Sequence, residues 1–278
     1  MGCPDWPKCF GRWIPPLSAT QLPADIDPGQ FNFALAWIEY INRLVGVVVG
    51  ILVVVVAVLA LKHYRRTPRI LMPSVLAAVL TAVQGWLGGR VVSSELEPIM
   101  VSAHLILALI IVSLLIYVSV RAYYELNPLA ERDAAYAVPM TWGVAALWLL
   151  VLVQVILGTQ IRESIEILAQ SMPLLSDLGL LARVGAVKDI HTFLGIVIAS
   201  LTWGIAIGLL RGSSNPSPVM WQAAWTMAGL VLLQVVFGVV LLMVGLPAVM
   251  QVLHLWLALL LSGVVLIAFA ALRQAREV

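Results

Sequence analysis

Seven stretches of the chain are nearly free of charge and long enough to cross a membrane as helices. The hydrocarbon core of a bilayer is about 30 Å thick, and about 20 helical residues span it. The chain is 62% hydrophobic and 11% charged, as is typical of a multi-pass membrane protein. We therefore predict an all-α polytopic membrane protein. Its spans are residues 37–61, 71–91, 99–120, 138–160, 187–210, 219–244 and 248–272.

The basic residues indicate which loops face the cytoplasm, because cytoplasmic loops are enriched in Lys and Arg. The loop at 62–69 holds one Lys and three Arg, and nine of the 16 Lys and Arg fall on its side of the membrane. We therefore expect a plasma-membrane protein with a cytoplasmic C-terminus and an outer segment 1–36. The net charge of +2 gives no indication of a nucleic-acid partner.

The chain also contains an internal duplication. The segment HLILALII matches HLWLALLL, and EYINRLVG matches KDIHTFLG, at offsets of 150 and 149 residues. His104 then stands opposite His254, and Asn42 opposite His191. Because the first half has three spans and the second four, we expect two four-helix bundles with a further helix before Cys3; a seven-helix protein is the alternative. The expected domains are the outer loop 1–36, the first half 37–136 and the second half 137–278.

Three histidines lie a few residues inside the same end of their spans, roughly 5–10 Å below the outer boundary at the helical rise. Ionisable side chains are costly in lipid and mark functional sites there. His191 and His254 lie at one depth, which suits two axial ligands of one haem. A zinc site would need further ligands, and Asp189 is the only Cys, Asp or Glu at the same depth. The alternative for a single ring, such as His104, is a hydrogen bond between helices; His63, in the basic loop, has no assigned role.

Glu39 lies one turn before Asn42 on the same helix face. A carboxylate at the edge of the apolar zone is a candidate proton donor or acceptor. An interfacial glutamate paired with Arg43 is the equally weighted alternative. Arg90 and Arg162, at the outer ends of their helices, are candidates for binding haem propionates; reaching lipid phosphates is the other interpretation.

Small and polar residues recur in two further patterns. Glutamine precedes glycine by one turn on three helices, at 84/88, 154/158 and 234/238, which close helix packing alone explains. The two cysteines, Cys3 and Cys9, lie in GCPDWPKCFGRWIPP. An outer loop is an oxidising environment, so a disulfide is favoured over a metal site, which would lack further ligands. Two unpaired thiols are the alternative.

Taken in order, GCPDWPKCFGRWIPP, Glu-Tyr-x-x-Arg from Glu39, QGWLGGRVV, and the histidines of SAHL, DIHTFLGI and VLHLWLAL resemble the haem A synthase family. The resemblance runs from Gly2 onward and implies eight transmembrane helices in two halves. It implies oxidation of the C8 methyl of haem O to a formyl group, which makes haem A for cytochrome oxidase. It also implies haem b as the cofactor of the second half, a substrate haem in the first, and an extracytoplasmic disulfide.

By this resemblance His191 and His254 hold haem b, His104 is an axial ligand of the substrate haem, and Glu39 is the catalytic carboxylate. The chain departs from the family at Asn42, where the family has histidine. Asparagine is a poor haem ligand, so His104 would bind alone or with an exchangeable ligand, or the chain is an inactive or divergent member.

Three functions remain in competition at this point. They are the synthase, a non-catalytic b-type cytochrome that transfers electrons, and a haem-binding assembly factor derived from the synthase. The expected partners are haem O, the lipid bilayer and an electron donor, with haem O synthase and a second copy of the chain as further candidates. The outer loop at 161–188 has an amphipathic pattern that predicts a position along the membrane surface.

Overall fold

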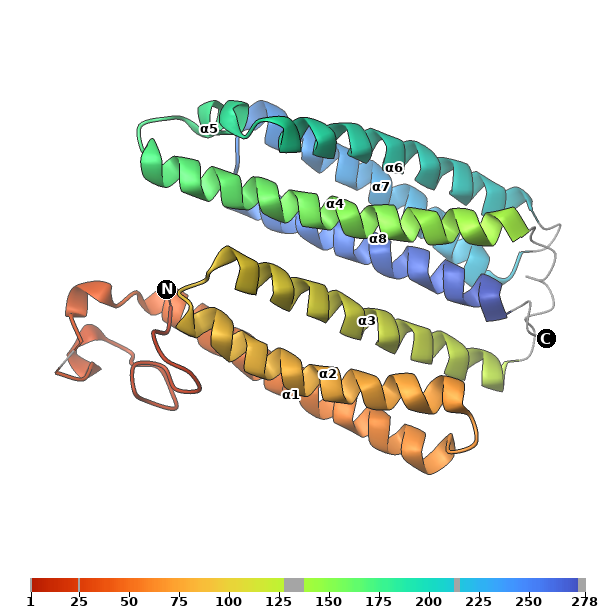
Figure 1. Ribbon diagram of the computed structural model, residues 1–278, viewed down its shortest axis with the longest axis horizontal. Helices are drawn as coiled ribbons and strands as arrows, with labels where there is room; N and C mark the ends of the chain where they lie inside the picture. Colours follow the sequence, from red (N-terminus) through yellow and green to blue (C-terminus); the bar gives the residue numbers. More distant parts are fainter. Residues whose placement is uncertain (1, 25, 128–137, 213–215, 275–278) are drawn as a thin grey trace. The chain divides into compact units, whose positions relative to one another are not determined.

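The computed structural model describes residues 2–24, 26–127, 138–212 and 216–274 of the 278-residue chain (Figure 1). From Phe33 on, the described residues are helical apart from connections, whereas the described segment before Phe33 contains only two short 3₁₀ helices. The long helices are α1 (Phe33–His63), α2 (Pro68–Ser93), α3 (Pro98–Leu126), α4 (Val138–Ser171), α6 (Ala186–Arg211), α7 (Pro218–Val244) and α8 (Ala248–Gln274). The short ones are η1 (Ala19–Gln21), η2 (Pro28–Gln30) and α5 (Asp177–Arg183).

These seven long helices are the seven candidate membrane spans of the described residues, which confirms the predicted fold class. Most of their ends lie within about one turn of the predicted ends. Two helices run further, α3 to Leu126 and α4 to Ser171. The surface loop expected at 161–188 is therefore wrong in its first part, because no Pro or Gly interrupts the sequence before Pro173 and α4 continues. The helix expected before Cys3 stays a prediction.

The chain divides into two compact units, Met1–Val118 and Ser119–Val278, and each is described on its own. The division expected between residues 136 and 137 lies outside the described residues. The first unit contains α1 and α2, which pack against each other, and most of α3. α3 meets α2 where Gln84 and Gly88 contact His104.

In the second unit four helices close a ring. α7 packs against α6 and α8, and α4 packs against the same two helices. This arrangement is a four-helix bundle, as the duplication predicted for the second half.

The fully buried side chains of this bundle gather towards one end. On α6 and α8 they begin only at Ile198 and Ala258, and on α7 they end at Val231. His191 and His254 lie beyond these limits and are half-buried. The four helices are therefore closely packed at one end and more open at the other, where the histidines lie. At this more open end α5, with Leu180 and Leu181 buried, packs against α4 and α7.

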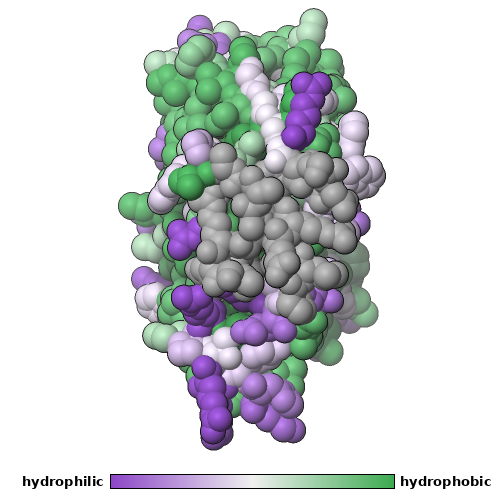
Figure 2. All heavy atoms as spheres, turned by 90° about the vertical axis from the view of Figure 1, so that its right-hand side faces the viewer, coloured by the Kyte–Doolittle hydropathy of each residue, from purple (hydrophilic) through white to green (hydrophobic). Residues whose placement is uncertain are grey.

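Local signals explain where the helices begin. The Asn32 side chain accepts the Leu35 N–H at 3.1 Å and caps α1, and the Ser217 hydroxyl accepts the Met220 N–H at 3.2 Å and caps α7. α2 and α7 both begin with proline, whose fixed φ suits the first helical position. Figure 2 views the end at which α1 turns into α2. Hydrophilic side chains gather around this turn.

Candidate functional site

His191 and His254 face each other in the second unit. His191 lies in the second turn of α6 and His254 in the second turn of α8, and the centres of their rings are 6.4 Å apart. The ring planes are inclined by 53°. The pairing that the sequence predicted between these two residues therefore has a direct geometric counterpart.

The separation of the rings suits one metal atom between them. Two metal–nitrogen bonds of about 2.0 Å, with about 1.1 Å from each nitrogen to its ring centre, place two coaxial imidazoles about 6.2 Å apart. The described residues contain no group of three His, Cys, Asp or Glu that could hold a bare metal ion. A porphyrin would supply the remaining four ligands itself, so the pair fits haem iron better than zinc. The open end of the bundle leaves these rings half-buried rather than enclosed by packed side chains.

Each ring also carries a polar atom that the described protein leaves unsatisfied. Nδ1 of His191 and Nδ1 of His254 are buried and have no hydrogen-bond partner, and the same is true of Nδ1 of His104. Buried polar groups are normally paired, and unpaired ones are concentrated at functional sites. Two such rings face to face are therefore hard to account for as helix-packing residues.

His104 has the same surroundings as His254, its repeat partner. It lies in the second turn of α3, and its ring contacts Gly88 of α2 as the His254 ring contacts Gly238 of α7. The duplication seen in the sequence is thus reproduced in side-chain contacts.

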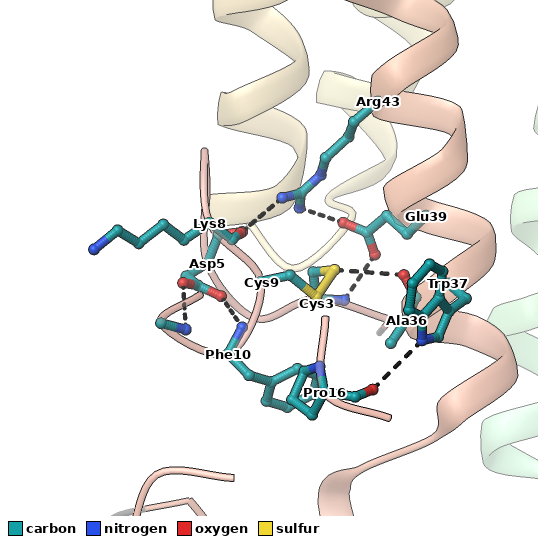
Figure 3. Close-up of a disulfide and its surroundings, with 11 residues drawn as sticks. Cys3, Asp5, Lys8, Cys9, Phe10, Pro16, Ala36, Trp37, Glu39 and Arg43 are labelled. Atoms are coloured by element: carbon teal, nitrogen blue, oxygen red, sulfur yellow. Dashed lines mark hydrogen bonds and ion pairs between the residues drawn. A yellow bond between two sulfur atoms is a disulfide. The ribbon is translucent and has the colours of Figure 1, made fainter. Parts of the chain in front are cut away.

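A second cluster lies where the N-terminal segment meets the start of α1 (Figure 3). Cys3 and Cys9 form a disulfide, which confirms the pairing favoured from the sequence. Both cysteines are buried with Phe10 and Ala36. Gly2 passes so close to α1 that a Cβ there would clash with the Leu35 carbonyl. The disulfide loop is therefore docked on the helix.

Glu39 and Arg43 connect this loop to α1. The Glu39 carboxylate pairs with Arg43 through one oxygen and accepts the Cys3 N–H at 2.9 Å through the other. Arg43 Nη1 donates to the carbonyls of Asp5 and Lys8 at 3.0 and 2.8 Å (Figure 3). The ion pair that was one interpretation of Glu39 is present, and about a quarter of the Glu39 side chain stays exposed.

The loop contains two contacts that the sequence did not suggest. The Asp5 carboxylate accepts the N–H groups of Phe10 and Gly11 at 2.6 and 2.9 Å, and both residues have positive φ. The Trp6 ring lies over Gly89, where a Cβ would be 3.0 Å away. The Cys-Pro-Asp-Trp-Pro motif could have predicted a fixed loop, but not that this loop reaches both α1 and α2.

The remaining predicted residues are less enclosed. The side chains of Asn42 on α1, Arg90 on α2 and Arg162 on α4 are exposed. Arg90 lies two residues after Gly88, and Arg162 four residues after Gly158. Their roles toward haem stay predictions. Asp189 is exposed and pairs with Lys188 at 3.5 Å, so it is directed to a cation rather than to the histidines. His63 ends α1 and is exposed, as expected of a residue without a role.

Comparison with known proteins identifies the family of the chain. The profile of the cytochrome oxidase assembly protein family COX15-CtaA matches residues 1–266. A heme A synthase of Shewanella oneidensis is 33% identical over 129 residues, which are 44% of this chain and 37% of the relative. A heme A synthase of Geobacillus kaustophilus is 29% identical over 144 residues, 51% of this chain and 41% of the relative.

The matched part spans only about two fifths of each of these relatives. No solved structure matches the chain significantly. The family match, by contrast, covers nearly the whole sequence and includes the disulfide loop and all three intramembrane histidines. The chain belongs to the COX15-CtaA family of cytochrome oxidase assembly proteins.

Proposed function

We propose that this protein is a membrane haem A synthase, which oxidises the C8 methyl of haem O to a formyl group and so supplies haem A to cytochrome oxidase. The observation that carries the proposal is the pair His191 and His254, whose ring centres are 6.4 Å apart at the open end of a four-helix bundle. The names of its relatives support the same reaction class.

In this proposal the second half, 137–278, holds a resident haem b with His191 and His254 as axial ligands. A haem with two histidine ligands has no free position for a substrate and supplies one-electron transfer. The contribution of the protein is to keep both rings at one depth, on the second turns of α6 and α8. Arg162, exposed near the end of the bundle, is the candidate partner of a propionate.

The first half, 37–136, takes the substrate haem. His104 is its axial ligand, supported by the likeness of its surroundings to those of His254. Asn42 stands at the position equivalent to His191 and is exposed, so it leaves the opposite face of the haem to an exchangeable ligand. Oxidation of a methyl group releases protons as well as electrons. Glu39, whose carboxylate Arg43 holds in place, is the group that we assign to proton transfer.

The rival function is electron transfer by a b-type cytochrome without synthase activity. The pair His191 and His254 fits either function. Glu39 distinguishes the two, because an electron carrier does not need a carboxylate for proton transfer. The family match favours the synthase.

The test is conversion of haem O in a host that makes haem O but lacks its own synthase. Haems extracted after expression of the wild-type chain should include haem A. A Glu39→Gln variant should keep the low-spin spectrum of the resident haem and lose haem A. The matched control is Glu97→Gln, an exposed carboxylate at the start of α3, which should convert haem O normally. Equal conversion by the Glu39 variant would remove the assigned role, and no haem A from the wild type would favour the cytochrome.

A further inference from the structure

Each intramembrane histidine ring rests against a glycine of the neighbouring helix. A Cβ added to the glycine would lie 3.3–3.4 Å from the Cε1 atom of the ring, in each of the three cases. The three pairs are Gly88 with His104, Gly158 with His191, and Gly238 with His254. Three helix pairs thus repeat one contact between a backbone and an imidazole edge, and the duplication relates two of them.

A glutamine lies one turn before each of these glycines and contacts the same histidine. Gln84 Nε2 donates to the His104 carbonyl at 3.0 Å, and Gln154 Nε2 donates to the His191 carbonyl at 2.8 Å. Gln234 Nε2 lies 3.2 Å from Nε2 of the His254 ring. The glutamine therefore ties down the histidine or its helix turn at the level of the ring.

We propose that these glutamine–glycine pairs are positioning devices for haem ligands, in which the glycine sets how far the imidazole can approach the neighbouring helix and the glutamine fixes the height of the histidine. The inference rests on the proposed haem-binding function. It goes beyond ordinary helix packing, because packing of small residues does not require a ring edge at the same place three times. It also implies that His104 is positioned as a haem ligand in the same way as His191 and His254.

The contact distance sets the size of the expected effect. At 3.3 Å the Cβ of a Gly88→Ala variant would be tighter than nine in ten real Cβ contacts, so the His104 ring would have to move by a few tenths of an ångström. At Gly158 and Gly238 the 3.4 Å contact would be at the lower limit of ordinary van der Waals contact. Ligand sites need placement to within about 0.5 Å. Loss of groups that orient a ligand typically weakens metal binding by about 10- to 100-fold. We expect Gly88→Ala to weaken binding of the substrate haem within this range, and Gly158→Ala and Gly238→Ala to weaken retention of the resident haem towards its lower end.

The chain offers matched controls on the same helices. Gly143 of α4 and Gly229 of α7 have open space where a Cβ would be added, so their alanine variants change helix propensity without touching a histidine. Gly85→Ala on α2, where an added Cβ also meets open space, is the control for Gly88→Ala in binding of the substrate haem. Each variant is purified in detergent, and haem content and the low-spin optical and electron-paramagnetic-resonance spectra are recorded. Gly143→Ala and Gly229→Ala should match the wild type.

A second measurement needs no haem. Thermal unfolding of haem-free Gly238→Ala is compared in the wild-type background and in a His254→Ala background. If the added methyl meets the ring, it lowers Tm only where the ring is present. Equal lowering in both backgrounds would overturn the inference, as would Gly238→Ala and Gly229→Ala proteins with the same spectra. A wild-type protein without haem would instead refute the proposed function, and the unfolding comparison would still decide whether the glycine places the ring.

Discussion

Opening the disulfide between Cys3 and Cys9 should release the N-terminal loop from α1 while the membrane helices stay folded. The two cysteines are six residues apart in sequence, and closing so short a loop removes about 2.2 kcal/mol of chain entropy from the undocked state. The double variant Cys3→Ala/Cys9→Ala loses this constraint. It also loses two buried sulfur atoms that pack with Phe10 and Ala36, so 2.2 kcal/mol is the smaller part of the expected cost.

Amide hydrogen exchange measures this release directly, because loop amides exchange through local undocking rather than global unfolding. The Cys3 N–H is bonded to Glu39, and those of Phe10 and Gly11 to Asp5. The entropic part alone, about 2.2 kcal/mol, corresponds to about 40-fold faster exchange at the latter two at 1.36 kcal/mol per factor of ten, so exchange should be at least this much faster. Amides of α7 and α8 should exchange at the wild-type rate.

Phe10→Leu is the control for lost packing, because Phe10 is buried in the same cluster and stacks edge-on against Phe31 while the disulfide stays closed. It should accelerate exchange by less than the double cysteine variant. Loop amides that stay protected in the double variant would refute the reasoning. They would mean that the Arg43 bonds to the Asp5 and Lys8 carbonyls suffice to dock the loop.

Three further outcomes are expected. His254→Ala should abolish the low-spin haem spectrum, whereas His63→Ala should leave it unchanged, as absorption spectra of the purified proteins will show. Asn42→His restores the histidine of the repeat, so protein loaded with haem should gain a second low-spin signal that depends on His104. Asp177→Ala removes the acceptor of the Leu246 N–H at 3.3 Å, an exposed bond worth about 1 kcal/mol, and should speed proteolysis between α4 and α6 several-fold without loss of haem.

Much of the membrane architecture could be predicted because lipid imposes one rule on every residue of a span. Charge-free stretches predicted the seven helices, and the common depth of His191 and His254 in the second half predicted that their rings lie together. The end of α4 was missed because hydropathy falls after Gln160 while helix propensity does not, and only Pro173 ends the helix-compatible sequence. Hydropathy indicates which residues lie in lipid, and it does not show whether a helix continues beyond the membrane.

The parts of the site that the sequence did not predict depend on contacts between distant residues. A pair of Glu39 with Arg43 was one of two interpretations of the sequence. The bonds from Arg43 to the carbonyls of Asp5 and Lys8 were not predictable, because they involve backbone atoms that every residue type carries. The glycines at 88, 158 and 238 were interpreted as packing residues. Only the positions of the imidazoles relative to the neighbouring helices distinguish a ring contact from a helix contact.

The uneven packing of the second bundle has a consequence for how the protein is made. Its closely packed end is formed by the parts of α4, α6, α7 and α8 that lie away from the histidines. These helices can therefore associate before haem binds. Under the proposed function, haem would then enter an already assembled bundle as a late step. Protein prepared without haem should therefore keep the helices of this bundle associated.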